Sequence, residues 1–170
     1  MPLSGTTLAV AAFAEQTATI DLGTSRAAQS LARSLSLGNG TGAGQADRVF
    51  SDRRTLAASG TEDLDLAGAL VDAFGATVTF ARVKGLVIAA AAGNSNNVVV
   101  GAASSNPWAT LLGATHTLTL RPGAFVAVGT GAADATGYAV TASTGDLLKV
   151  ANSGAGSSVT YDIHIIGCSA

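Results

Sequence analysis

The stretch "SVTYDIHIIG", residues 158–167, decides the fold of this chain. Its apolar and polar side chains alternate with a period of two, which is the spacing of a β-strand with one buried face and one exposed face. The apolar set is Val159, Tyr161, Ile163 and Ile165, and the polar set is Thr160, Asp162 and His164. We therefore expect a half-buried strand, of the kind found in antiparallel sheets.

The second half of the chain repeats this pattern. "HTLTL" (116–120) alternates in the same way and runs into the turn sequence Arg121-Pro122-Gly123. The most apolar run, "VKGLVIAAAAG" (83–93), is far shorter than the roughly 20 residues that a membrane-spanning helix needs, so it predicts a buried strand and no membrane anchor. Short strands with regular turns predict an all-β fold, an antiparallel β-sandwich of jelly-roll-like type.

The first half is less regular. Around Leu31, alternation fits better than a helical spacing, because it places Leu35 and Leu37 on the same face. The segment up to about Gly23 shows no core of its own and is interpreted as an extended arm, which either lies over a neighbouring molecule or is a frayed end. We expect the arm and a first strand region over 1–45 and the β-sandwich over 46–170, with two early strands joined near Ser59-Gly60.

Two glycine-rich segments raise the question of phosphate binding. Gly154-Ala155-Gly156 begins like a dinucleotide fingerprint, but Val159 stands at the third position and a strand follows where a helix is needed. "GNGTGAG" (38–44) has no Lys-Ser or Lys-Thr pair after it, as a P-loop requires. Both segments are interpreted as loops, and no cofactor is expected.

Residues that could support catalysis or metal binding are few. His116, His164 and Cys168 are the only histidines and the only cysteine, and no G-x-S-x-G elbow occurs, so we expect no enzyme activity. Alternation places Asp63 and Asp65 on one strand face, where they could hold calcium, but a solvated strand face is the simpler interpretation. No metal site is expected.

The amino-acid composition restricts the classes of partner that the protein is expected to bind. Only 12% of the residues are charged, the net charge is −2, and 9 residues are lysine or arginine, which does not suit phosphate neutralisation, so no nucleic acid is expected. The N-terminus lacks the basic region of a secretory signal. Low charge with many small side chains fits either a compact β-protein or a protein packed against copies and partners, and both interpretations stay open.

Four residues are candidates for a partner interface. Phe13 lies in the predicted arm, and Arg53 and Arg54 could pair across a hairpin or contact an acidic patch on a partner. Trp108, the only tryptophan, follows a proline in a polar turn, and it is either a core residue or an exposed interface anchor.

The segments "RPGAFVAVGTGAADATGYAVTASTGDLLKVANSGAGSSVTYDIHIIG" (121–167) and "RTLAASGTEDLDLAGALVDAFGATVTFARVKGLVI" (54–88) resemble small virion structural proteins of tailed bacteriophages, of the capsid decoration or cement type. The resemblance implies a jelly-roll-like domain, made in the bacterial cytoplasm, that binds the major capsid protein on the outer surface of the virion shell. It also implies a homo-oligomer, a trimer first and a dimer second, and transfers no catalytic residue. The alternative is a phage tail or fibre domain that binds a receptor or glycan.

Overall fold

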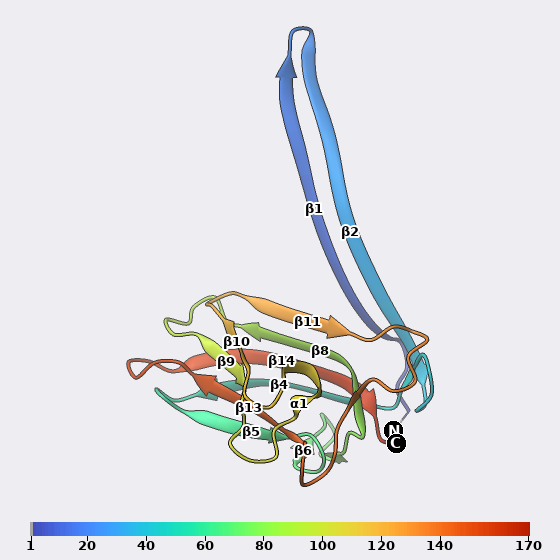
Figure 1. The fold of residues 1–170 in the computed structure, drawn as a ribbon, viewed down its shortest axis with the longest axis vertical. Helices are drawn as coiled ribbons and strands as arrows, with labels where there is room; N and C mark the ends of the chain where they lie inside the picture. Colours follow the sequence, from blue (N-terminus) through green and yellow to red (C-terminus); the bar gives the residue numbers. More distant parts are fainter. Residues whose placement is uncertain (1) are drawn as a thin grey trace.

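The computed structural model describes residues 2–170 and shows an all-β protein in two parts, a sandwich and a long hairpin that projects from one end of it (Figure 1). The hairpin, called the arm below, consists of β1 (Thr6–Ile20) and β2 (Gly23–Asn39). Both chain termini lie near the end of the sandwich from which the arm rises (Figure 1).

Two antiparallel sheets form the sandwich. The first sheet has the order β11 (Phe125–Gly129), β8 (Arg82–Ala90), β14 (Val159–Cys168), β4 (Arg48–Leu56), and β12 (Tyr138–Ala139) also pairs with β8. The second sheet has the order β10 (Thr117–Leu120), β9 (Val98–Gly101), β13 (Leu147–Asn152), β5 (Thr61–Asp65). The remaining elements are short: β3 (Gln45–Ala46), the hairpin β6 (Leu70–Val71) and β7 (Thr77–Val78), and α1 (Ala109–Leu112).

The predicted β-sandwich is confirmed, and the core lies between the two sheets. Along β14 the four apolar side chains from Val159 to Ile165 are buried, whereas Asp162 is exposed. In β10, Leu120 is buried and Thr119 is exposed, again as the alternation predicts. The jelly-roll connectivity stays a prediction.

The glycine-rich loop before β14 is a chain reversal. The backbone N–H of Gly154 donates to the side-chain oxygen of Asn152, and the side-chain amide of Asn152 donates to the Ser157 and Ala57 carbonyls. A Cβ on Gly154 would lie only 2.5 Å from the Asn96 side chain, which explains why glycine occupies this position. The loop therefore turns a corner, as predicted.

The two early strands predicted from the sequence are β4 and β5, with a turn at Ser59-Gly60 in which the Gly60 N–H donates to the Ala57 carbonyl at 2.8 Å. They belong to different sheets, because β4 pairs with β14 and β5 pairs with β13. The turn therefore connects the two layers of the sandwich.

The arm differs from the expected extended segment. Every residue from Thr6 to Ile20 pairs with a residue of β2, down to Gly23, and the turn between the strands has two residues. The sequence analysis expected an arm over this region without assigning its pairing, because the sequence pattern of β1 alone could not reveal that β2 supplies its backbone partners. The alternation predicted around Leu31 is confirmed.

Candidate interaction surface on the arm

The arm has two faces of different chemistry. Residues directly opposite in an antiparallel pair share a face, so the register Leu8↔Leu35 and Ala12↔Leu31 separates the side chains into two sets. One set, called the apolar face, holds every aliphatic side chain of the two strands that is larger than alanine. These are Leu8, Val10, Ile20, Leu31, Leu35 and Leu37. The other set, the hydroxyl-rich face, is mostly serine, threonine and alanine.

At its root, the arm packs on the sandwich through the apolar face. Leu35 and Leu37 are buried with Ala46 and Ile166, and Leu8 packs against this cluster. Gly129 of β11 permits the contact, because a Cβ at that position would lie 3.0 Å from a methyl group of Leu8. The apolar face is thus a packing surface at the root of the arm, although the same face is exposed to solvent beyond the root.

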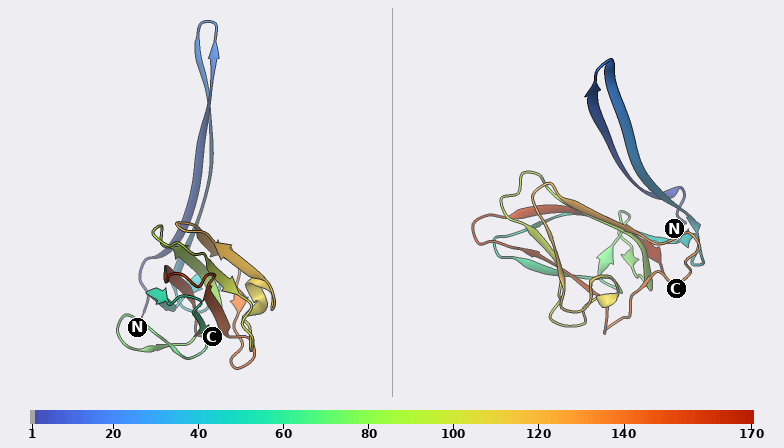
Figure 2. Two further views of the ribbon diagram at one scale, coloured as in Figure 1. Left: turned by 90° about the vertical axis from the view of Figure 1, so that its left-hand side faces the viewer. Right: turned by 45° about the horizontal axis from the view of Figure 1, so that its top comes forward.

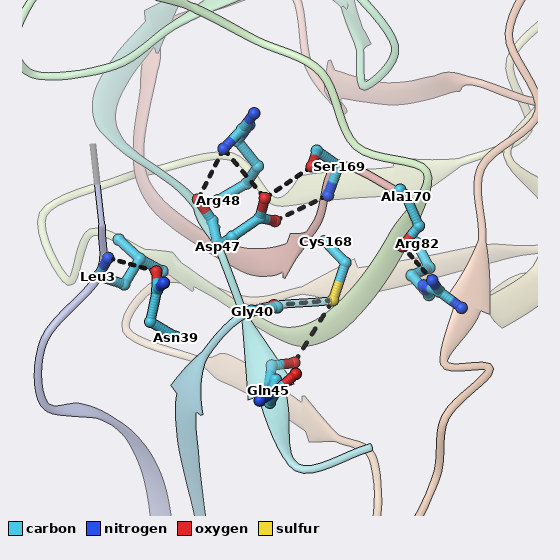
Figure 3. Close-up of polar contacts among 10 residues, drawn as sticks. All are labelled: Leu3, Asn39, Gly40, Gln45, Asp47, Arg48, Arg82, Cys168, Ser169 and Ala170. Carbon is cyan, nitrogen blue, oxygen red and sulfur yellow. Dashed lines mark hydrogen bonds and ion pairs between the residues drawn. The ribbon is translucent and has the colours of Figure 1, made fainter. Parts of the chain in front are cut away.

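Hydrogen bonds around the C-terminal strand tie the root in place (Figure 3). Ser169 donates from its backbone N–H and its hydroxyl to the Asp47 carboxylate, at 2.8 and 2.6 Å. The buried Cys168 thiol lies 3.4 Å from the Gln45 carbonyl, and its desolvation raises its pKa. The backbone N–H of Leu3 donates to Asn39 at 2.9 Å. The end of β14 therefore holds the segment that leads out of the arm.

Beyond the root, the arm is exposed on both faces. Residues 9–34 are all exposed, and the exposed fractions are 58% for Leu31 and 43% for Val10 on the apolar face. The hydroxyl-rich face carries the ion pair of Glu15 with Arg26, at 2.8 Å, and Phe13, which is 71% exposed. The larger exposed apolar side chains of the apolar face are thus Val10 and Leu31 near the root and Ile20 at the tip, and the same face carries Arg33 beside Val10 and the hydrogen-bonded Gln16 and Gln29 between them.

Such a ribbon is unusual for an isolated molecule. Two-stranded hairpins are at best marginally stable in water, and they need a third strand or a packed face for support. The two strands cross in the left view of Figure 2, so the ribbon twists along its length, as two-stranded ribbons do. The distal arm thus exposes Val10, Phe13, Ile20 and Leu31 without a third strand or a packed face to support it.

The predicted interface residues lie in different environments. Phe13 is exposed on the arm, and Arg53 lies on the outer face of the first sheet, where its guanidinium holds Asp162 in a two-pronged pair at 2.6 and 2.9 Å. Arg54 points toward the interior and contacts Glu62. Nothing in the structure tests these three as partner contacts, and they stay predictions.

Trp108 requires a correction. It is 4% exposed in the core, its indole N–H donates to the Ala139 carbonyl at 2.8 Å, and its ring meets Tyr138 edge to face. The interpretation of Trp108 as an exposed anchor is therefore wrong, and the core alternative holds. The turn sequence around it could not show this, because the burial comes from β12, about 30 residues further along the chain.

The few chemically active side chains are dispersed. His164 lies on the outer face of β14, where partial burial lowers its pKa, and His116 is exposed ahead of β10. Asp63 is exposed, whereas Asp65 accepts the Ala67 N–H at 2.8 Å. Within residues 2–170, no three acidic, histidine or cysteine side chains are grouped as a metal site would require. Over the same residues, no helix has the length and apolarity to cross a membrane.

Fold and surface together define a β-sandwich with a projecting hairpin, one face of which holds all the larger aliphatic side chains of its two strands. Comparison with family models, curated proteins and solved structures finds no match for the chain.

Proposed function

We propose that this protein is a bacteriophage capsid decoration protein, which binds the outer surface of the shell and stabilises it through contacts between subunits. The observation that carries the proposal is the arm, whose apolar face leaves Leu31 and Val10 exposed because no side chain within residues 2–170 covers them. Stabilising a shell against internal pressure requires surface shared between neighbours and no chemistry, and the arm provides such surface. The resemblance of residues 54–88 and 121–167 to virion proteins supports the same function.

In this proposal the partners are the major capsid protein and further copies of the chain, in a closed homo-oligomer, with a trimer first and a dimer second. The rival function, receptor or glycan binding at a tail or fibre, depends on an exposed aromatic platform or a metal cluster. Trp108, the main candidate for such a platform, is buried and hydrogen-bonded in the core. Trp108 therefore cannot supply that platform, and a location at the capsid stays our proposal.

The experiment is a cryo-electron-microscopy reconstruction of the particle whose genome encodes this chain. Density for a β-sandwich with a projecting hairpin at regular positions over the shell is expected. Density confined to the tail or fibres would replace the proposal with receptor binding, and absence from the particle would overturn both virion functions.

A shortened chain gives a second test. Because Leu8 and Leu35 are directly paired, residues 9–34 can be replaced by a two-residue Asn-Gly turn that closes the hairpin at its root. We expect this variant to fold, because the core cluster between the two sheets contains no arm residue. Its binding to shells that lack the protein, measured by co-sedimentation, should be weakened, and unchanged binding would contradict a role for the arm.

A further inference from the structure

The contact at the root of the arm shows what kind of surface its apolar face fits. Leu8 packs beside Gly85 and Gly129, and a Cβ on either glycine would lie 3.0–3.4 Å from a Leu8 methyl group. Both glycines lie on the outer face of the first sheet, because they pair with each other across β8 and β11 and Gly85 precedes Leu86, which faces the core. The apolar face therefore already binds an outer sheet face that is built from small residues.

The outer face of the first sheet continues past this contact. Val87 and Ala89 follow Gly85 at alternate positions of β8, and Ala127 lies opposite Val87 on β11. Val87 and Ala89 line a shallow hollow together with Ser51 of β4 and His164 of β14. The Arg53–Asp162 ion pair lines the same hollow, with Asp162 paired opposite Ala89. The arm leaves the sheet after its root (Figure 1), so this part of the face stays open to a second molecule.

We propose that the distal arm of one copy docks, through its apolar face, on the outer face of the first sheet of a second copy of this chain. Leu31 and Val10 of the arm would then pack over Val87 and Ala89 of the neighbour. This contact between two molecules would be of the same type as the contact of Leu8 with Gly129 within one molecule. This inference concerns the purified protein and does not depend on the proposed role at the capsid.

The surface buried by this arm-to-sheet contact would be large enough for a specific protein–protein interface. The exposed part of the face that holds Val10 and Leu31 runs from Val10 to Ile20, about 35 Å at 3.3 Å per residue, and a two-stranded ribbon with its side chains is about 10 Å wide. Gln16 and Gln29 lie in the middle of this stretch and Arg33 lies beside Val10, so the contact is part apolar and part polar. A copy that gives one arm and receives another would bury about 700 Å² of its own surface, close to the roughly 800 Å² per partner of a standard interface.

The twist of the arm also matches the twist of the sheet on which it would dock. The arm and the sheet are both twisted β-structures of the same hand, and such surfaces pack face to face with their strands about 30° apart. Because the arm and the sheet face are different surfaces, the contact is head-to-tail, and it closes when the copies form a ring. A ring of three agrees with the trimer that is the first proposal for the assembly.

Paired substitutions on the arm test the contact. Leu31 and Ser30 are adjacent but lie on opposite faces of β2, so Leu31→Asp places a carboxylate in the proposed contact and Ser30→Asp places the same charge outside it. By analytical ultracentrifugation, we expect the parent chain and Ser30→Asp to associate, and Leu31→Asp to associate at least about tenfold more weakly. Both positions are exposed, so thermal melting should show that both variants fold.

A substitution on the sheet identifies the receiving surface. Ala89→Lys puts a long cationic side chain on the outer face and should weaken association as strongly as Leu31→Asp. Ser51→Lys, in the same hollow, is the second variant if Ala89→Lys fails to fold. Mixing Leu31→Asp with Ala89→Lys should restore a heteromer, because the first variant keeps a working sheet face and the second keeps a working arm.

Three results would overturn the proposal. A parent chain that stays monomeric at high micromolar concentration excludes the contact. Equal effects of Leu31→Asp and Ser30→Asp exclude the apolar face as the binding surface. Full association of Ala89→Lys and of Ser51→Lys would show that the arms bind each other or another surface, with the sheet face uninvolved.

Discussion

Arg53 and Arg54 are neighbours in the chain, yet their guanidinium groups lie on opposite faces of β4 and hold different carboxylates. Arg53 holds Asp162 on the outer face, at a highly exposed position. Arg54 turns inward and contacts Glu62 at 2.6 Å and Asp52 at 2.8 Å. Glu62 also accepts the hydroxyl of the fully buried Tyr161 at 2.7 Å, so Arg54 belongs to a network that joins the two sheets.

This difference predicts unequal effects on stability. Arg54→Ala leaves the mostly buried Glu62 without its cation, and we expect the free energy of unfolding in urea to fall by about 1–3 kcal/mol. Arg53→Ala breaks only an exposed pair, and its unfolding curve should overlay that of the parent. Equal losses for the two variants would contradict the assignment of Arg54 to the interior.

We expect Gly167, the one glycine of β14, to tolerate no larger side chain. A Cβ there would lie closer to the Arg82 carbonyl than real Cβ atoms approach, and 2.7 Å from the Phe80 ring. Gly167→Ala should therefore lower the free energy of unfolding by about 3 kcal/mol, in the upper range of overpacked cores. Gly156→Ala, where no atom lies within 4 Å, is the control and should change stability little.

The lowered pKa of Asp134 predicts that the stability of the folded protein depends on pH in the acidic range. The Thr136 hydroxyl and the backbone N–H groups of Gly137 and Thr136 hydrogen-bond its carboxylate and lower its pKa from 3.8 to about 2. Because the pKa is lower in the folded state than in the unfolded state, the stabilisation is present above about pH 4 and is lost as the pH falls toward 2. Melting temperatures of Asp134→Asn should fall less steeply than those of the parent over this interval, and parallel curves would contradict the prediction.

The Cys168 thiol should report on the root of the arm. It is buried and its pKa is raised by desolvation, so labelling by a thiol reagent should be slow in the native protein and fast in urea. Asp47→Ala removes both hydrogen bonds to Ser169 and should increase the native labelling rate several-fold while the melting transition stays cooperative. Asp63→Ala, at an exposed position in β5, is the matched control and should leave the rate unchanged.

Much of the sandwich could be predicted from local pattern. The period of two in β14 and β10, and the turn at Ser59-Gly60, each depend on residues close together in the chain, and the structure confirms them. Which strands share a sheet could not be predicted in this way. The pairing of β14 with β4 joins residues more than 100 positions apart, as Asp162↔Arg53 shows, and no short-range signal encodes it.

The candidate site was only partly predictable. The alternation around Leu31 revealed which side chains share a face, and the lack of a core before Gly23 indicated a projecting segment. The sequence could not show that these two stretches are the strands of one hairpin, because that depends on the register Leu8↔Leu35. It also could not separate exposed Phe13 from buried Trp108, since exposure is set by the elements packed over a residue.

By itself, the sequence determined that this chain is a β-sandwich without a recognisable catalytic or cofactor motif, because strand periodicity, turn residues and motif spacing are local properties. Only the tertiary structure decided that β2 pairs with β1 and carries the arm away from the core, and that Val87 and Ala89 on the outer face of the first sheet are only partly covered. Those features arise from contacts between distant segments, where the burial of each side chain depends on the packing of the whole chain.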